Sequence, residues 1–140
     1  MKLSRIFLLL LLLFLFVPLV VSAQQKKLIG TVNSARAGNN PGCSYFVGGR
    51  LIFVLDAIDG TWMNIDGREV TLTLVKEIGP KGKLKAGSRS TSRYVSGDIT
   101  VDIVEVITKL GKYVSKMSAT FTMRKGNRTQ IVRATGECGD

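Results

Sequence analysis

Short runs of β-branched and aromatic residues, separated by pairs that favour turns, make up the chain from residue 27 onward. Pairs such as Asp66-Gly67 and Gly126-Asn127 are typical of two-residue hairpin turns, which join neighbouring antiparallel strands. No segment of this region repeats its apolar residues at the spacing of an amphipathic helix. The sequence therefore predicts an all-β fold, either a small antiparallel sandwich or a barrel.

Nine strands are expected from the positions of these runs and turns. They cover residues 27–33, 43–47, 50–57, 61–65, 68–77, 88–95, 99–110, 113–124 and 128–135. Tight turns at 111–112 and 126–127 join the last three strands, which predicts a C-terminal three-stranded meander.

A two-residue turn determines which residues lie opposite each other in its hairpin. The turns at 66–67 and 126–127 bring apolar side chains together on one face of each hairpin. The expected pairs are Met63 with Val70, Thr61 with Leu72, Phe121 with Val132, and Ala119 with Ala134. Trp62 then lies on the opposite face of its hairpin, where we expect a second layer to cover it.

The strand expected at 99–110 changes its apolar phase along its length. The turn at 111–112 places Val106 opposite Met117, but the apolar residues further upstream occupy odd-numbered positions. One extra residue, a β-bulge at Ile103-Val104, reconciles the two phases. With that bulge two further apolar pairs form: Ile103 with Phe121, and Val101 with Met123.

Cys43 and Cys138 are the only cysteines of the chain. In an exported protein such a pair is typical of a disulfide, and we expect these two residues to be bonded. The bond closes a loop of about 95 residues, which in the simplest chain-entropy model is worth about 4 to 5 kcal/mol. Two cysteines in a chain without histidine cannot supply the four ligands of a structural zinc site.

Residues 1–23 have the features of a secretory signal peptide, with a basic start, an unbroken apolar run at 6–17 and Ala23 at the cleavage site. The rival interpretation is a membrane anchor. However, the whole apolar stretch at 6–21 has 16 residues, fewer than the roughly 20 of a membrane span, and contains Pro18 near its end. We therefore expect cleavage before Gln24.

Residues 24–140 have the length of one domain, and we expect a single all-β domain there. An exported chain without a retained anchor is secreted or periplasmic, so we expect no transmembrane segment after cleavage.

Positive charge dominates this chain, with 20 lysines and arginines against 10 aspartates and glutamates. Such an excess attracts anionic partners, although it also serves solubility alone. The densest basic stretch lies in and around the glycine-rich connector at 78–87. Its cations are the predicted ligand-binding residues: Lys76, Lys81, Lys83, Lys85, Arg89 and Arg93. A polyanion is the expected partner, either an acidic glycan, a lipopolysaccharide or an anionic lipid.

Histidine is absent from the chain, which excludes Ser-His and Cys-His nucleophile pairs. Asp98 and Asp102 would lie about 13 Å apart on one strand, beyond the roughly 5 to 9.5 Å of glycosidase carboxylates. Asp102 and Glu105 approach more closely, but we expect both on a solvated face. We therefore predict no enzyme, no catalytic residue and no cofactor.

Three aspartates, Asp56, Asp59 and Asp66, cluster around two turns. Their spacing does not match an EF-hand loop, and Asp-Gly pairs are common in hairpin turns. No metal site is therefore predicted.

Three strings, WMNIDGR at 62–68, GDITVD at 97–102 and ATGECG at 134–139, resemble a group of small exported bacterial proteins without an assigned function. A second stretch is similar to the serine-rich loop of the small β-barrel inhibitors of C-type lysozyme: Ser88, Ser90, Ser92, Arg93 and Tyr94. That similarity implies insertion of the loop into a basic enzyme. Here the loop is itself basic, so like charges oppose the encounter.

Together these features favour an exported, non-catalytic protein that binds an anionic ligand of the envelope or the extracellular space. The alternative is a secreted inhibitor or protein-binding module of the lysozyme-inhibitor type, with a protein partner.

Overall fold

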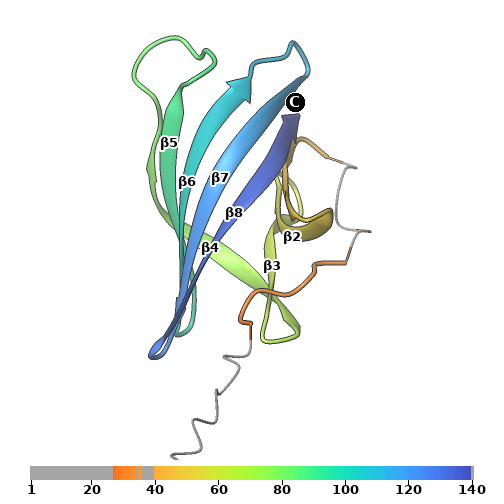
Figure 1. The fold of residues 1–140 in the computed structure, drawn as a ribbon, viewed down its shortest axis with the longest axis vertical. Coiled ribbons are helices and arrows are strands. Elements are labelled where there is room, and N and C mark those ends of the chain that lie inside the picture. Colours follow the sequence, from red (N-terminus) through yellow and green to blue (C-terminus); the bar gives the residue numbers. More distant parts are fainter. Residues whose placement is uncertain (1–26, 34, 36–39, 140) are drawn as a thin grey trace, which may run out of the picture.

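Eight antiparallel strands form a closed barrel in which each strand pairs with the next along the chain (Figure 1). The computed structural model describes residues 27–33, 35 and 40–139. The expected signal peptide at 1–23 and its cleavage point lie outside these residues. The all-β prediction is confirmed, and of its two forms the structure adopts the barrel. Across the described ranges we find no helix with the length and apolarity needed to cross a membrane.

The strands from residue 42 onward follow the predicted runs closely, and the turns at 66–67 and 126–127 lie where they were predicted. The tight turn predicted at 111–112 is wrong, because this connection spans residues 110–113. They are β1 (Gly42–Val47), β2 (Arg50–Asp56), β3 (Gly60–Ile65), β4 (Arg68–Ile78), β5 (Arg89–Ser96), β6 (Ile99–Lys109), β7 (Val114–Lys125) and β8 (Arg128–Gly139). The C-terminal meander of β6, β7 and β8 is confirmed.

The prediction of a strand at 27–33 is wrong. This segment forms only one isolated bridge, between Ile29 and Ile65. Its other backbone hydrogen bonds go to different elements: Gly30 donates to Asn64 of β3, and Val32 donates to Leu51 of β2. A segment whose donors are divided among several elements cannot form a ladder with any one of them.

Strand pairing between β1 and β8 closes the barrel. Cys43 lies directly opposite Cys138 in this pair, and the two form the predicted disulfide. The covalent bond therefore joins the two strands that bring the beginning and the end of the barrel together.

Aromatic side chains from four strands fill the middle of the barrel. Tyr45 and Phe53 pack edge to face with ring centroids 5.8 Å apart, and Phe121 lies 5.3 Å from each of them. Tyr94 extends this cluster from β5. Methionine and branched aliphatic side chains complete the core, including Met63, Ile65, Val101, Ile103 and Met123.

A second, smaller apolar cluster lies on the other face of the wall formed by β2 and β3. Trp62 and Phe46 pack there against Leu51, Val54 and Val32. The predicted pairs of the hairpin around Asp66-Gly67 are confirmed, and Trp62 has the predicted orientation. The layer that covers this side is the N-terminal segment through Val32, rather than a second sheet.

The bulge predicted at Ile103-Val104 is wrong. Strand β6 keeps one phase through this region, and its irregularity lies between Ile107 and Lys109. Ile107 therefore takes the place opposite Met117 that was predicted for Val106. The two pairs predicted further upstream, Ile103 with Phe121 and Val101 with Met123, are confirmed.

Two features account for this difference: the connection between β6 and β7 spans residues 110–113 rather than two residues, and an inward position of β6 is taken by Glu105. The Glu105 carboxylate accepts hydrogen bonds there from Tyr45 and Ser90. Apolarity alone favours Val104 and Val106 as the inward residues, but a carboxylate can take such a position when both its oxygens have donors.

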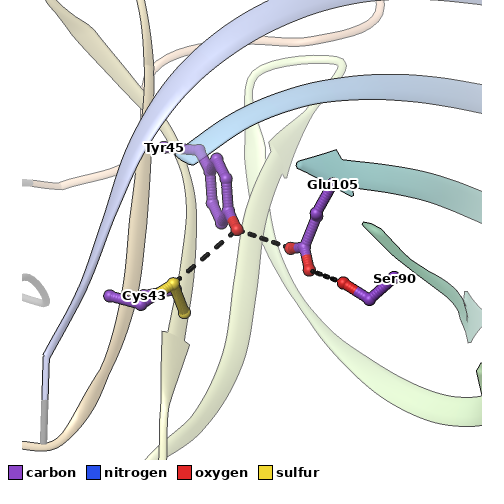
Figure 2. The surroundings of a disulfide bond; sticks show 5 residues. Cys43, Tyr45, Ser90 and Glu105 are labelled. Carbon is purple, nitrogen blue, oxygen red and sulfur yellow. Dashed lines mark hydrogen bonds between the residues drawn. A yellow bond between two sulfur atoms is a disulfide. The ribbon is translucent and has the colours of Figure 1, made fainter. Parts of the chain in front are cut away.

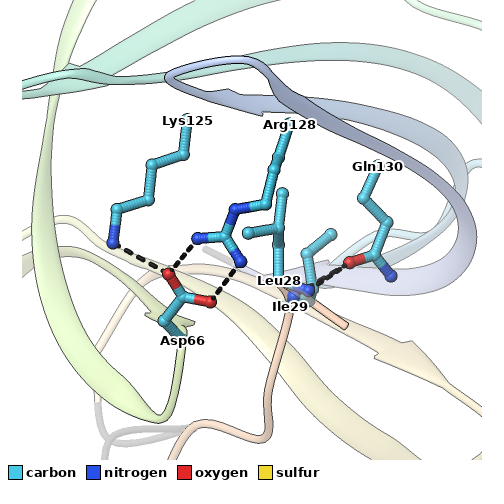
Figure 3. A network of polar contacts seen from close by, with 6 residues as sticks. All are labelled: Leu28, Ile29, Asp66, Lys125, Arg128 and Gln130. Atoms are coloured by element: carbon cyan, nitrogen blue, oxygen red, sulfur yellow. Dashed lines mark hydrogen bonds and ion pairs between the residues drawn. The ribbon is translucent and has the colours of Figure 1, made fainter. Parts of the chain in front are cut away.

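Two turns are tied together at the end of the barrel opposite the disulfide. Asp66, in the turn between β3 and β4, accepts hydrogen bonds from Lys125 at 2.9 Å and from Arg128 at 3.1 Å (Figure 3). Beside them the Gln130 amide oxygen accepts the backbone N–H groups of Leu28 and Ile29. These contacts fix the N-terminal segment across this end.

Asp66 should make the free energy of unfolding depend on pH in the acid range. Hydrogen bonds from Arg128 and Lys125 lower the pKa of its carboxyl from 3.8 to about 2. A carboxyl whose pKa is lower in the folded state stabilises the fold above its unfolded value near 4, and this contribution disappears as the pH falls toward 2. Asp66→Asn, which also tolerates the positive φ of this position, should therefore be less stable than the parent at pH 7.

Urea denaturation at pH 7 and pH 2 measures this effect. The difference between the parent and Asp66→Asn should narrow at pH 2, because the carboxyl of the folded parent is then about half protonated and that of the unfolded chain almost fully so. Asp98→Asn, at an exposed carboxylate in the turn between β5 and β6, is the matched control and should differ little from the parent at either pH. An equal loss by Asp66→Asn at both values would contradict the proposed ion pairing.

Candidate functional site

A cavity of about 270 Å³ lies at the disulfide end of the barrel. Residues from the β4–β5 loop, the β6–β7 loop and the adjoining ends of β5, β7 and β8 line it. Figure 1 shows these two loops extending from the same end of the barrel. They meet there because successive antiparallel strands alternate in direction, so every second connection lies at the same end.

Apolar side chains form most of the cavity wall. Ile107 and Met117 lie deep in it and are nearly buried, whereas Leu84, Leu110 and Tyr113 stand at its rim. The three rim residues are 49%, 46% and 68% exposed. Large, solvent-exposed apolar side chains around a concave site are typical of a surface that binds a partner or ligand.

A hydrogen-bonded carboxylate lies near the disulfide inside the barrel (Figure 2). Glu105 accepts from the Tyr45 hydroxyl at 2.5 Å and from the Ser90 hydroxyl at 3.0 Å. Ser90 itself lines the cavity, and the Tyr45 hydroxyl also lies 3.8 Å from Cys138 Sγ of the disulfide. The cavity lining therefore includes the Ser90 hydroxyl and one half of the disulfide, and Ser90 connects it to the Glu105 carboxylate inside the barrel.

Both tyrosines near Glu105 remain protonated at physiological pH. Burial, together with the adjacent Glu105 carboxylate, raises the pKa of the Tyr45 hydroxyl far above its usual value. The same two causes raise the pKa of Tyr94 to about 12. Tyr45 is thus held as a hydrogen-bond donor to Glu105, and neither phenol is poised to act as a base.

The β4–β5 loop presents cations next to the cavity. Lys81, Lys83 and Lys85 are exposed on it, and Arg89, the first residue of β5, lines the cavity. The second half of the loop is anchored, since Gly87 donates its N–H to the Ile107 carbonyl of β6. Lys85 and Ser88 also hydrogen bond to each other across the turn that precedes β5.

The other two predicted cations lie elsewhere. Lys76 and Arg93 face each other in register between β4 and β5, on the outer wall of the barrel, where they border a shallow depression. Arg93 forms an ion pair with Asp102 at 2.5 Å. The structure thus divides the six predicted residues into a group of four at the cavity and a group of two on the outer wall.

Sequence reasoning missed the contribution of the β6–β7 loop. Lys112 lies in this loop, with its ammonium 5.0 Å from the ring centre of Tyr113, a residue of the cavity rim. The strand order could have indicated this loop. In an antiparallel meander every second connection lies at the same end of the sheet, which places the connectors at 78–88 and 110–113 together.

The carboxylates considered for catalysis are separated by the β6 strand. Asp102 lies on the outer wall, where hydrogen bonds from Arg93 and Arg124 lower the pKa of its carboxyl. Glu105 points into the barrel instead, so the expectation that both share a solvated face is wrong for Glu105. The two carboxylates therefore do not form an acid and base pair.

The aspartates considered for calcium have other partners. Asp56 accepts the N–H groups of Ile58 and Asp59, which lowers the pKa of its carboxyl and stabilises the turn between β2 and β3. Asp66 is held by the two cations already described. Within residues 27–33, 35 and 40–139, no three side chains of histidine, cysteine, aspartate or glutamate gather in a way that could hold a metal ion.

These features define a small antiparallel β-barrel that is closed by a disulfide and carries a cavity with an apolar wall and a cationic loop. Comparisons with protein-family models, with curated proteins and with solved structures give no match for this chain. The resemblances noted in the sequence therefore stay predictions, and a functional proposal depends on the site. The disulfide is compatible with an oxidising, extracytoplasmic compartment.

Proposed function

We propose that this chain is an exported, non-catalytic binding protein whose anionic ligand is held at the cavity end of the barrel. The observation that carries the proposal is the position of four cations at that end. Arg89 lines the cavity, and Lys81, Lys83 and Lys85 lie on the loop that borders it. Glu77 is the one carboxylate among the lining residues.

Ion pairing distinguishes these four cations from others in the barrel. Arg93, Lys116, Arg124, Lys125 and Arg128 each pair with a carboxylate. None of the four cations at the cavity pairs with a carboxylate of the part of the chain that the structure describes. Their charge is therefore available to a ligand, and the attraction should weaken as salt screens it.

Replacing Lys81, Lys83 and Lys85 together by glutamine should weaken binding to heparin and make it less sensitive to salt. Each cation that neutralises an anionic group releases a counterion, so the slope of log affinity against log salt should become shallower by up to about three. The melting temperature should change little, because exposed charges contribute little to stability. Titrations at several salt concentrations measure the slope.

A matched control removes the same charge away from the cavity. Arg50 and Arg68 lie at the opposite end of the barrel and Arg133 on its outer wall, and all three are exposed. Changing these three to glutamine should leave most of the heparin affinity intact. Equal weakening by both triple variants would show that net charge, rather than a site, attracts the polyanion.

The alternative of a secreted inhibitor or protein-binding module depends on the Ser88 to Tyr94 stretch. In the barrel, Ser90 donates to Glu105 and Tyr94 is buried among the core aromatics. Tyr94 is therefore inaccessible to a protein partner and the Ser90 hydroxyl is already bonded within the barrel, which favours the anionic-ligand proposal. If the parent binds neither heparin, lipopolysaccharide, anionic vesicles nor nucleic acid but is captured by immobilised hydrolases, the inhibitor alternative replaces our proposal.

A further inference from the structure

We infer that the ligand is a free anionic amphiphile, with its hydrocarbon chain in the barrel-end cavity and its phosphate or carboxylate against Arg89 and the loop lysines. This inference rests on the proposed function and names the chemical class of its ligand. It depends on three observations: the composition of the cavity wall, the position of the charges and the size of the cavity.

The apolar wall of the cavity is poorly matched to a purely polar polyanion. Ile107 and Met117 form its inner part, and Leu84, Leu110 and Tyr113 continue the apolar surface to the rim. A glycan or nucleic-acid backbone would leave this surface in water, whereas a hydrocarbon chain would cover it. We therefore expect the ligand to have an apolar part that packs against this wall.

Charge determines the orientation of that ligand. Arg89 lines the cavity and the lysines lie on the β4–β5 loop that borders it, whereas the Glu105 carboxylate lies inside the barrel, where it accepts a hydrogen bond from the lining residue Ser90. A second anionic group near Glu105 would be repelled. Both Glu105 oxygens already accept hydrogen bonds, from Tyr45 and Ser90, so this carboxylate does not need a polar group of the ligand as a partner. The chain therefore enters the cavity and the anionic head stays outside.

The volume of the cavity limits the number of hydrocarbon chains that it can hold. The cavity of about 270 Å³ lies just below the roughly 300 to 1,000 Å³ of most small-molecule pockets. It is suited to one slender chain, rather than to the paired chains of a membrane lipid. This is why we commit to a monomeric amphiphile and not to docking on a membrane surface.

A series of alkyl phosphates, from butyl to dodecyl, tests the inference by isothermal titration calorimetry on the secreted chain. Each compound is kept below its critical micelle concentration. Affinity should rise by up to about fourfold per added methylene, the value for complete burial, and then level off once the cavity is full. The heat-capacity change should become more negative over the same part of the series. Alkyl glucosides of equal length, which lack the charge, should bind at least tenfold more weakly.

Substitutions at the cavity rim test where the hydrocarbon chain of the ligand lies. Leu84→Ser combined with Leu110→Ser should weaken octyl phosphate at least fivefold and butyl phosphate by a similar factor, because the methylenes next to the anionic head pass these rim residues in both compounds. Both residues are about half exposed, so the variant should fold. Ile58→Ser combined with Ile131→Ser is the matched control, since these exposed residues do not line the cavity.

The outcomes separate this inference from the proposed function. Binding of alkyl phosphates that is lost in the triple lysine variant but does not depend on chain length would overturn the amphiphile and leave the anionic site in place. Equal binding of glucosides and phosphates would also overturn it. Binding to phosphatidylglycerol vesicles that dodecyl phosphate does not displace would show membrane docking instead. Failure of both the phosphates and heparin to bind would overturn both proposals.

Discussion

Phe121→Ala should lower the free energy of unfolding by about 3 to 5 kcal/mol, one of the largest losses available to a single substitution in this chain. The Phe121 side chain is fully buried, and its ring packs against both Tyr45 and Phe53 at 5.3 Å. These rings come from three different strands, so the side chain joins distant parts of the barrel wall. Its removal would leave a cavity that the surrounding strands can fill only partly.

Urea denaturation of the parent and the variant measures this loss. Tyr113→Ala provides a matched aromatic control, because Tyr113 is 68% exposed and its truncation should change stability by no more than about 0.5 kcal/mol. A loss below about 1 kcal/mol for Phe121→Ala would be too small for a filled core position, and would contradict its placement between Ile103 and Val132.

Replacing Cys43 and Cys138 together by alanine should cost about 2 to 5 kcal/mol. The bond spans 95 residues and lies between the two strands that close the barrel. Without it the unfolded chain gains conformational freedom, and the pairing of β1 with β8 depends on backbone hydrogen bonds and packing alone. The double variant should therefore unfold at lower denaturant than the parent.

Thiol alkylation supplies the control for this experiment. The unreduced, denatured parent should contain no thiol that reacts, and reduction should bring its denaturation midpoint close to that of the double variant. Two reactive thiols before reduction, or equal midpoints for the parent and the variant, would exclude a stabilising disulfide.

The cationic half of the candidate site was predictable from sequence, but the cavity was not. Lysines that alternate with glycines at 81–85 indicate an exposed basic loop from local composition alone. The apolar wall is made by residues such as Leu84, Ile107 and Met117, which lie on three separate segments. No local pattern connects them, because only the closure of the barrel brings these segments to one end.

Glu105 is the residue for which local reasoning was least adequate. A carboxylate within a run of apolar residues is ordinarily expected to face water. The assumed two-residue turn at 111–112 agreed with that expectation, because it placed Val106 opposite Met117 and therefore put the bulge at Ile103-Val104 instead of near Ile107. The inward position of Glu105 depends on Tyr45, which lies 60 residues earlier in the chain. Such a donor cannot be recognised until β1 and β6 lie across the barrel from each other.

Interactions between close neighbours in the chain were therefore sufficient for the eight strands of the barrel and for the turns and pairings around Asp66-Gly67 and Gly126-Asn127. They were not sufficient for the segment at 27–33 or for the β6–β7 connection. A two-residue turn leaves its hairpin only one register that keeps the apolar side chains on one face. The barrel rather than a sandwich, the cover over Trp62 and the inward Glu105 all depend on contacts between segments far apart in the chain. Tertiary structure decided these features because their free energy comes from closing the sheet on itself, a condition that no single hairpin contains.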